Sequence, residues 1–227
     1  MSMHLQRELE HLKKELLRIA AMVENATDKA LVSLVERRIE LAYEVIDEDD
    51  LIDQAEVRIE EDCLKILALH QPMATDLRFV ITALKVNNDL ERVGDLAVNI
   101  AERAAYLSRK EMLAVTLDFP KMAAEVMKML KAALDALTRQ DTELARKVIA
   151  GDDLIDDYNR RMYTSLQHLM RENPSTIKRA MHLLSASRHL ERIADLATNI
   201  CEDLIYMVEG EVIRHRPSDY LKEEEKG

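Results

Sequence analysis

The sequence feature that most constrains the fold is an internal repeat. The stretch DLERVGDLAVNIAER at residues 89–103 returns one hundred residues later as HLERIADLATNICED, with nine of fifteen aligned positions identical. A second match relates residues 34–53 to residues 137–156 at an offset of 103, with eleven of twenty positions identical. The offset falls by three because one turn is longer in the first copy. Such self-similarity predicts that one supersecondary unit is used twice.

The hydrophobic pattern within each copy favours long helices. Apolar residues recur at three- and four-residue steps from Leu5 to Leu34, which predicts one amphipathic helix. A second helix is expected to begin with DDLIDQ near Asp49, and a third to cover residues 77–108 after the HQPMATD turn. The same order follows at LDFPKM, with Asp118 as N-cap, at GDDLIDDYNRRM and after ENPST.

The repeat and the helical pattern together predict an all-α fold of two tandem, pseudo-symmetric three-helix bundles. Only 4 Gly, 4 Pro and 4% aromatic residues occur in 227, which agrees with helices and disfavours a β-rich fold. Residues 1–110 are expected to form the first bundle and residues 111–210 the second. Residues 211–227 are expected to form a flexible tail.

Composition excludes several functional classes. The net charge of −11 argues against a nucleic-acid partner, whose phosphates need a basic face. The sequence contains no apolar run of about 20 residues and no signal peptide, so we expect no membrane insertion. Cys63 and Cys201 lack a disulfide framework, which predicts free buried thiols in a reducing, cytoplasmic compartment. Without a phosphate loop or nucleophile elbow, the chain is not expected to be an enzyme.

Each copy of the repeat carries a ladder of acidic and amide residues on one helical face. The ladders are Glu91, Asp95 and Asn99 in the first copy and Glu191, Asp195 and Asn199 in the second. Apolar residues fill the opposite side of each helix. A solvated face is one interpretation, but such faces usually mix lysine with glutamate. Stacked like charges destabilise a helix unless something compensates them.

A second acidic motif precedes each ladder and supplies a compensating arrangement. It consists of Asp49 and Asp53 in the first copy and Asp152 and Asp156 in the second. In an antiparallel helix hairpin, residues equidistant from the turn lie side by side, so each copy should bring two carboxylate pairs to one level. The alternative role is N-capping and complementing the helix dipole at a helix start, and this is the role expected of Asp50 and Asp153.

Clustered carboxylate and amide oxygens suit hard or borderline divalent and trivalent cations, such as magnesium, manganese, calcium or iron. Without a cation the carboxylates should raise one another's pKa values. A carboxylate metal-storage or redox protein is the alternative function. Against it, the chain has a single ExxH motif, Glu8 to His11, whereas di-iron carboxylate bundles use two. A plain helical scaffold with solvated ladders is the third hypothesis.

Three motifs together resemble the PhoU family of phosphate-uptake regulators. They are QPMATDLR at residues 71–78, LERVGDLAVNI at residues 90–100 and LERIADLATNICE at residues 190–202, in a layout covering about residues 1–210. The resemblance implies a cytoplasmic helical protein, commonly a homodimer, that represses the phosphate-starvation response when phosphate is plentiful. It further implies an adaptor between the nucleotide-binding subunit of the phosphate ABC transporter and a membrane sensor histidine kinase.

The resemblance also implies metal ligands. Some members of the family bind multinuclear iron or zinc clusters on E/D-x-x-x-D motifs, which in this sequence are the four acidic pairs described above. The second copy departs from the family pattern in its turn, which reads ENPSTIKR and places Lys178 where the first copy has Arg78. A role of Asp76 or Arg78 would therefore belong to the first half alone.

Overall fold

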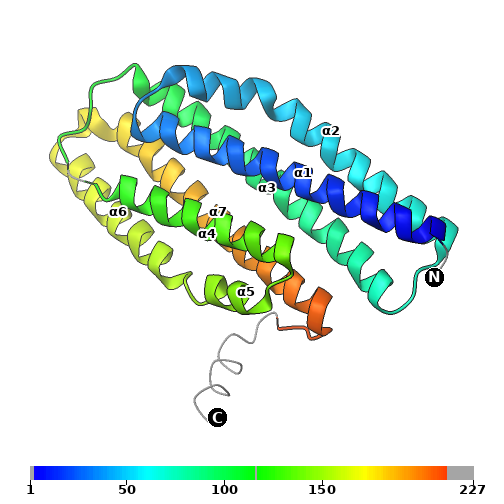
Figure 1. Ribbon diagram of the computed structural model, residues 1–227. Helices are drawn as coiled ribbons and strands as arrows, with labels where there is room; N and C mark the ends of the chain where they lie inside the picture. Colours follow the sequence, from blue (N-terminus) through cyan, green and yellow to red (C-terminus); the bar gives the residue numbers. More distant parts are fainter. Residues whose placement is uncertain (1–2, 116, 214–227) are drawn as a thin grey trace, which may run out of the picture.

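The computed structural model describes residues 3–115 and 117–213, and all regular structure within these residues is helical (Figure 1). The first bundle consists of α1 (Met3–Val35), α2 (Ile39–His70) and α3 (Thr75–Ser108). The second consists of α4 (Phe119–Arg139), α5 (Thr142–Ile149), α6 (Asp153–Glu172), the 3₁₀ turn η1 (Pro174–Thr176) and α7 (Ile177–Glu209). The predicted all-α fold of two pseudo-symmetric bundles is confirmed.

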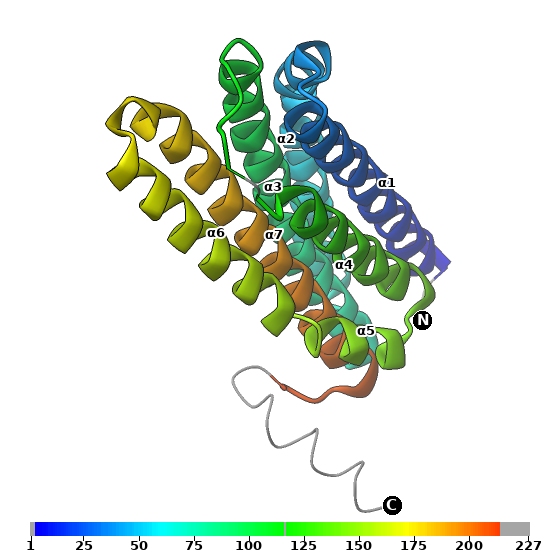
Figure 2. The same cartoon turned by 90° about the vertical axis from the view of Figure 1, so that its left-hand side faces the viewer.

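The two bundles lie side by side and meet along α3 and α7, which occupy the centre of the molecule (Figures 1 and 2). Polar contacts cross this seam at related positions. Lys85 Nζ on α3 donates to Asp203 Oδ1 on α7 over 2.8 Å. At the equivalent place across the pseudo-twofold, Arg103 Nε donates to Ser185 Oγ over 3.4 Å. The two contacts therefore occupy pseudo-symmetric positions, but one is an ion pair and the other joins a guanidinium to a neutral hydroxyl.

Apolar burial explains why the two central helices form and where they lie. On α3 the side predicted to be apolar is fully buried at Val86, Leu90 and Ile100. Leu190 and Ile200 are equally buried on α7, at the positions the repeat predicts. Each fully buried side chain of this size contributes about 1.5–3 kcal/mol to folding. The buried stripes therefore fix which face of each helix is left for the acidic ladders.

Both cysteines are free and buried, as predicted. Burial raises the pKa of the Cys63 and Cys201 thiols to about 12. Within the described residues, no helix is both long and apolar enough to cross a membrane. Most of the expected tail, residues 214–227, lies outside the described residues, whereas Ile213 is buried.

The start of the second helix differs from the sequence prediction. α2 begins at Ile39, well before Asp49, because the hydrophobic pattern continues upstream through Ala42 and Val45, which are buried. Asp49 and its neighbour Asp50 therefore lie in the interior of a continuous helix. The capping role expected of Asp50 is wrong.

In the second bundle, the helix of the GDDLIDDYNRRM stretch begins where the sequence predicts, but it is preceded by a short helix that the sequence pattern did not predict. A short helix, α5, ends at Ile149, and α6 begins at Asp153. Gly151 disfavours helix, and its N–H bonds to the Val148 carbonyl in a tighter turn. Asp152 occupies the N-cap position of α6 without a side-chain cap bond, and Asp153 lies in the first turn as expected.

Asp118 also occupies the predicted N-cap position, at the start of α4, but its side chain makes no cap bond. The carboxylate instead accepts a 2.9 Å hydrogen bond from Lys121 Nζ. Pro120 lies in the first turn, as predicted. The helix start was therefore placed correctly, while the predicted capping interaction was not found.

Candidate functional site

The α2–α3 hairpin brings the two acidic motifs of the first bundle together. Burial, followed by the nearby charges of Asp53 and Asp95, raises the pKa of Asp49 to about 6. Burial also raises the pKa of Glu91, with Asp95 and Asp53 as the next causes. Because the carboxylates of the two helices raise one another's pKa values, all four predicted residues belong to one electrostatic cluster. We call this set the first carboxylate cluster.

A glycine lets the two helices of this cluster approach closely. A Cβ atom added to Gly94 would lie 3.3 Å from Ile52 Cγ2 and 4.0 Å from Asp49 Oδ1. The corresponding residue of the second bundle is Ala194, which is fully buried. The missing side chain at Gly94 therefore sets the distance between α2 and α3 beside Asp49.

The second bundle repeats the arrangement between α6 and α7. Burial raises the pKa of Asp152 to about 6, followed by the charges of Asp195 and Asp156. Burial raises the pKa of Glu191 and of Asp195 as well, and Asp156 is the first charge that acts on each. These residues form the second carboxylate cluster. The charges that raise these pKa values come from both helices, which is what is expected if each hairpin brings two carboxylate pairs to one level.

The two predicted asparagines each lie one turn after the last aspartate of their ladder. The Asn99 amide donates a 2.8 Å hydrogen bond to the Asp95 carbonyl of its own helix. That bond leaves its side-chain oxygen as the atom that remains available to a cation. Asn199 is half-buried on α7, like Asn99 on α3.

Sequence reasoning missed one polar position beside each cluster. Glu56 lies one turn after Asp53, and its pKa is raised by burial, then by Glu60 and Asp53. At the equivalent position of the second bundle, Asn159 Nδ2 donates to Glu191 Oε2 over 2.7 Å. Both positions follow the acidic motif by three residues and share its helical face, which is the signal that predicts them.

In the second cluster, a chain of hydrogen bonds holds Glu191 in place. Ser187 Oγ donates to Asn159 Oδ1 over 2.6 Å, so the Asn159 side chain is held from both ends. In the first bundle Asn87 takes the serine's place, and its amide donates to the Glu56 carbonyl over 3.0 Å. Glu191 is therefore oriented by a fixed amide, whereas Glu91 faces a further carboxylate.

The chemistry of the donor set fits a metal ion, although the side chains are not gathered around one point. In residues 3–115 and 117–213, no group of three or more His, Cys, Asp or Glu side chains is close enough to hold a metal ion. The carboxylates nevertheless raise one another's pKa values through space. A bound cation would reverse this repulsion, so rotation of the side chains toward a cation is electrostatically favourable.

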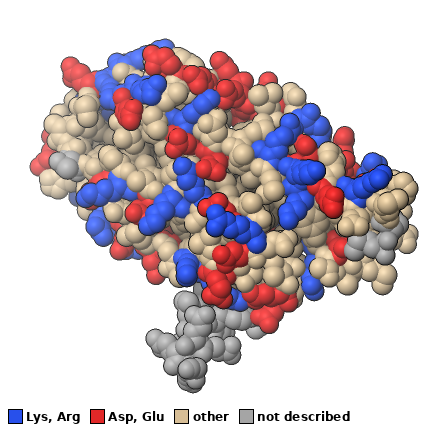
Figure 3. All heavy atoms as spheres, in the orientation of Figure 1, with Lys and Arg blue, Asp and Glu red and all other residues tan. Residues whose placement is uncertain are grey.

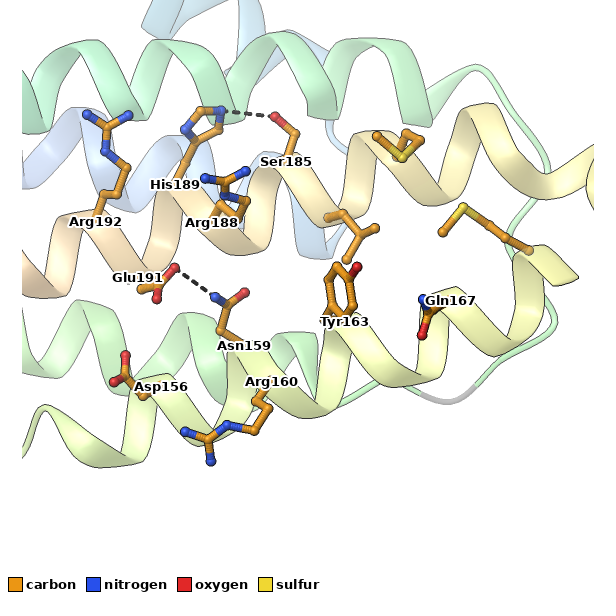
Figure 4. A pocket seen from close by; sticks show the side chains of 13 residues that line it. Asp156, Asn159, Arg160, Tyr163, Gln167, Ser185, Arg188, His189, Glu191 and Arg192 are labelled. Atoms are coloured by element: carbon orange, nitrogen blue, oxygen red, sulfur yellow. Dashed lines mark hydrogen bonds between the residues drawn. The ribbon is translucent and has the colours of Figure 1, made fainter.

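A cleft of about 1020 Å³ lies between α6 and α7 beside the second cluster (Figure 4). Asp156 and Glu191 lie at one end of it, and Tyr163 and Gln167 at the other. Its basic members are Arg160, Arg188, His189 and Arg192. Over the face shown in Figure 3, by contrast, acidic and basic side chains are interspersed.

The fold and the paired carboxylate clusters define a class: a helical protein with two copies of one bundle, each with an acidic site between its second and third helices. The PhoU domain matches the chain twice, at residues 16–104 and 119–204. The chain therefore belongs to the PhoU family.

Similar proteins cover nearly the whole chain. The phosphate-specific transport system accessory protein PhoU homolog of Aquifex aeolicus is 42% identical over 214 residues, which is 94% of this chain and 97% of that protein. The homolog from Pseudomonas aeruginosa is 38% identical over 96% of this chain and 90% of its own length. A crystal structure of PhoU from Pseudomonas aeruginosa matches with a TM-score of 0.88 at 37% identity, covering 91% of this chain and 99% of that one.

Proposed function

We propose that the protein is a non-enzymatic regulator of phosphate uptake and represses the phosphate-starvation response when phosphate is plentiful. The observation that carries this proposal is the likeness to accessory proteins of phosphate-specific transport along almost the whole chain. The protein acts in the cytoplasm as a homodimeric adaptor. Its partners are the nucleotide-binding subunit of the phosphate ABC transporter and a membrane sensor histidine kinase.

Deletion of the gene tests this function directly. A strain without the protein should express phosphate-starvation genes in high phosphate, because the component that conveys sufficiency is missing. Complementation with the full chain should restore repression. A deletion strain that represses those genes normally in high phosphate contradicts the proposal.

The second part of the proposal is that each carboxylate cluster binds multivalent metal ions. The residues that would hold them are Asp49, Asp53, Glu91 and Asp95 in the first bundle and Asp152, Asp156, Glu191 and Asp195 in the second. Asn99 and Asn199 would contribute amide oxygens. Iron, as a multinuclear cluster, zinc, manganese and magnesium are the candidate ions. When bound, the metal neutralises the repulsion that raises the pKa of Asp49 and Asp152.

Elemental analysis of protein purified without chelator tests metal binding and identifies the ion. Protein without bound metal under these conditions supports the helical-scaffold hypothesis instead. A ferroxidase assay on iron-loaded protein separates regulation from the metal-storage or redox alternative. We expect no ferroxidase turnover, because both residues of the single ExxH motif already contact other side chains of the first bundle. Its Glu8 carboxylate lies 2.9 Å from His70 Nε2, and His11 lies 3.6 Å from Asp62.

A further inference from the structure

The cleft between α6 and α7 combines cationic and neutral hydrogen-bond donors on a chain whose net charge is −11. Arg188, His189 and Arg192 line it from α7, and Asn159 and Tyr163 from α6 (Figure 4). Its volume of about 1020 Å³ is larger than one small anion requires. A local cationic site on an acidic protein points to an anionic ligand rather than to a second metal ion.

Comparison with the first bundle shows that the repeat does not impose this basic character. The cleft of the second bundle carries three arginines against two carboxylates, Asp156 and Glu191. The equivalent positions of the first bundle carry two bases against five carboxylates, namely Lys85 and Arg92 against Asp53, Glu56, Glu60, Asp89 and Glu91. The same backbone arrangement is therefore acidic in one bundle and basic in the other.

The basic side chains differ in how they are paired. Arg92 in the first bundle lies 3.8 Å from Asp89, but His189 replaces that carboxylate beside Arg192. Arg188 and Arg192 form no ion pair within the described residues, although they act at longer range on Glu191 and Asp195.

Arg160 takes no part in the proposed site. Its guanidinium donates to Asp157 over 2.6 Å and points away from α7 (Figure 4). Two of the three arginines of the cleft, Arg188 and Arg192, therefore remain available to a ligand.

His189 adds a neutral donor to the same site. Ser185 Oγ accepts from Arg103 Nε over 3.4 Å, and it lies 3.1 Å from His189 Nε2. When the serine hydroxyl donates to Nε2, the imidazole proton is on Nδ1. His189 Nδ1 is buried without a hydrogen-bond partner in the structure. A buried donor without a partner is unfavourable, and a ligand oxygen would satisfy it once the imidazole ring turns Nδ1 toward the cleft.

We infer that this cleft binds a phosphate group, either as free phosphate or carried by a small organic molecule. Arg188 and Arg192 supply charge-assisted hydrogen bonds, and His189 Nδ1 supplies a neutral one. Guanidinium groups match the geometry of phosphate oxygens, and the remaining volume accommodates an organic substituent. The choice of phosphate over other oxyanions rests on the proposed function. In this site, the regulator would contact phosphate directly.

Titration calorimetry on the purified, chelator-treated full chain tests the inference. The probes are inorganic phosphate, adenosine monophosphate, adenosine and sulfate. We expect binding of a phosphate-bearing probe and none of adenosine. If adenosine monophosphate binds more tightly than inorganic phosphate, the ligand is an organic phosphate. If inorganic phosphate binds more tightly, the ligand is the free ion.

The variant Arg188→Gln with Arg192→Gln should weaken phosphate binding by about tenfold or more, since each lost bond to a charged group is substantial. The matched control is Arg92→Gln in the first bundle, which should leave binding unchanged. Circular dichroism of both variants should retain the helical signal, because these arginines are exposed.

The inference is overturned if no phosphate probe binds, if the double variant binds as tightly as the parent, or if Arg92→Gln weakens binding equally. Phosphate bound only by metal-loaded protein, and lost in Glu191→Gln with Asp195→Asn, also overturns it, because the metal would then be the binding group. The deletion-strain experiment fails or succeeds independently of these measurements, so failure of the proposed function remains distinguishable from failure of this site.

Discussion

The α2–α3 face of the first bundle and the α6–α7 face of the second share one backbone plan and differ in charge. α2 carries eleven acidic residues against two Lys or Arg, whereas α5 and α6 together carry five of each. The burial pattern over residues 91–100 is nevertheless identical to that over residues 191–200. The comparison teaches that core positions and the acidic ladders are shared, while the residues around them set two different electrostatic environments.

The largest expected difference concerns metal retention. Glu91→Gln with Asp95→Asn should remove metal from the first bundle, and Glu191→Gln with Asp195→Asn from the second. Chelation should lower the melting temperature of the parent, because a ligand at a hundredfold excess over Kd stabilises each site by about 2.7 kcal/mol. Each double variant should show about half the chelator effect and half the metal content.

Stepwise chelation sharpens this comparison. The first cluster has the additional Glu56 carboxylate, whereas the second has Asn159 and nearby arginines. Protein that retains only the first site should therefore hold metal at lower free concentrations than protein that retains only the second. Equal retention, measured by elemental analysis against a metal buffer, would contradict this order.

A second difference concerns the distance between the helices. Gly94→Val should destabilise the first bundle by about 1–3 kcal/mol, because the new side chain overlaps Ile52, whose Cγ2 already lies 3.3 Å from a Cβ at this position. The reciprocal control Ala194→Gly should lower stability by about 1–2 kcal/mol, because it combines lower helix propensity with the loss of one buried methyl group. Urea unfolding measures both. A loss for Gly94→Val that is no larger than the loss for Ala194→Gly would mean that the glycine does not set the spacing.

The pH dependence of metal-free protein should be the same in both bundles. The pKa values of Asp49 and Asp152 are raised from 3.8 to about 6 in the folded state. Folding therefore takes up protons, and stability should fall as the pH rises from about 4 to about 6. After solvent screening, each residue should account for about 1 kcal/mol of this loss.

Asp49→Asn and Asp152→Asn should each remove that share of the loss and raise the stability of metal-free protein at pH 7. Urea unfolding between pH 4 and pH 7 compares the two variants. A much larger effect in one bundle would show that the different charges around the two clusters act unequally on Asp49 and Asp152.

The smallest expected effects concern the position after each acidic motif. Asn159→Ala should cost about 1 kcal/mol, since it removes hydrogen bonds to Glu191 and Ser187. Glu56→Gln should instead raise the stability of metal-free protein by a few tenths of a kcal/mol, because it relieves repulsion from Glu60 and Asp53. Thermal unfolding in chelator compares them, and changes of the same sign would contradict the assigned roles.

Periodicity made the helices and their buried faces predictable, because apolar spacing dictates which side of a helix is removed from water. Leu90 and Leu190 were placed in the core correctly for this reason. The start of α2 was misplaced because a run of acidic residues near Asp49 reads like a helix beginning. The start of α6 was placed correctly, whereas α5 was not predicted as a separate helix, because its eight residues are too few to show a clear periodicity.

The sequence by itself determined that one helical unit is used twice and that each copy carries paired acidic motifs. Local spacing contains that information, since helix geometry relates residues three and four apart. Tertiary structure alone decided which polar groups surround each cluster. It brought Glu56 to Glu91 in one bundle, and Asn159 to Glu191 beside Arg188 in the other. These contacts join residues far apart in the chain, and only the packing of two helices determines their distance and the burial that shifts their pKa values.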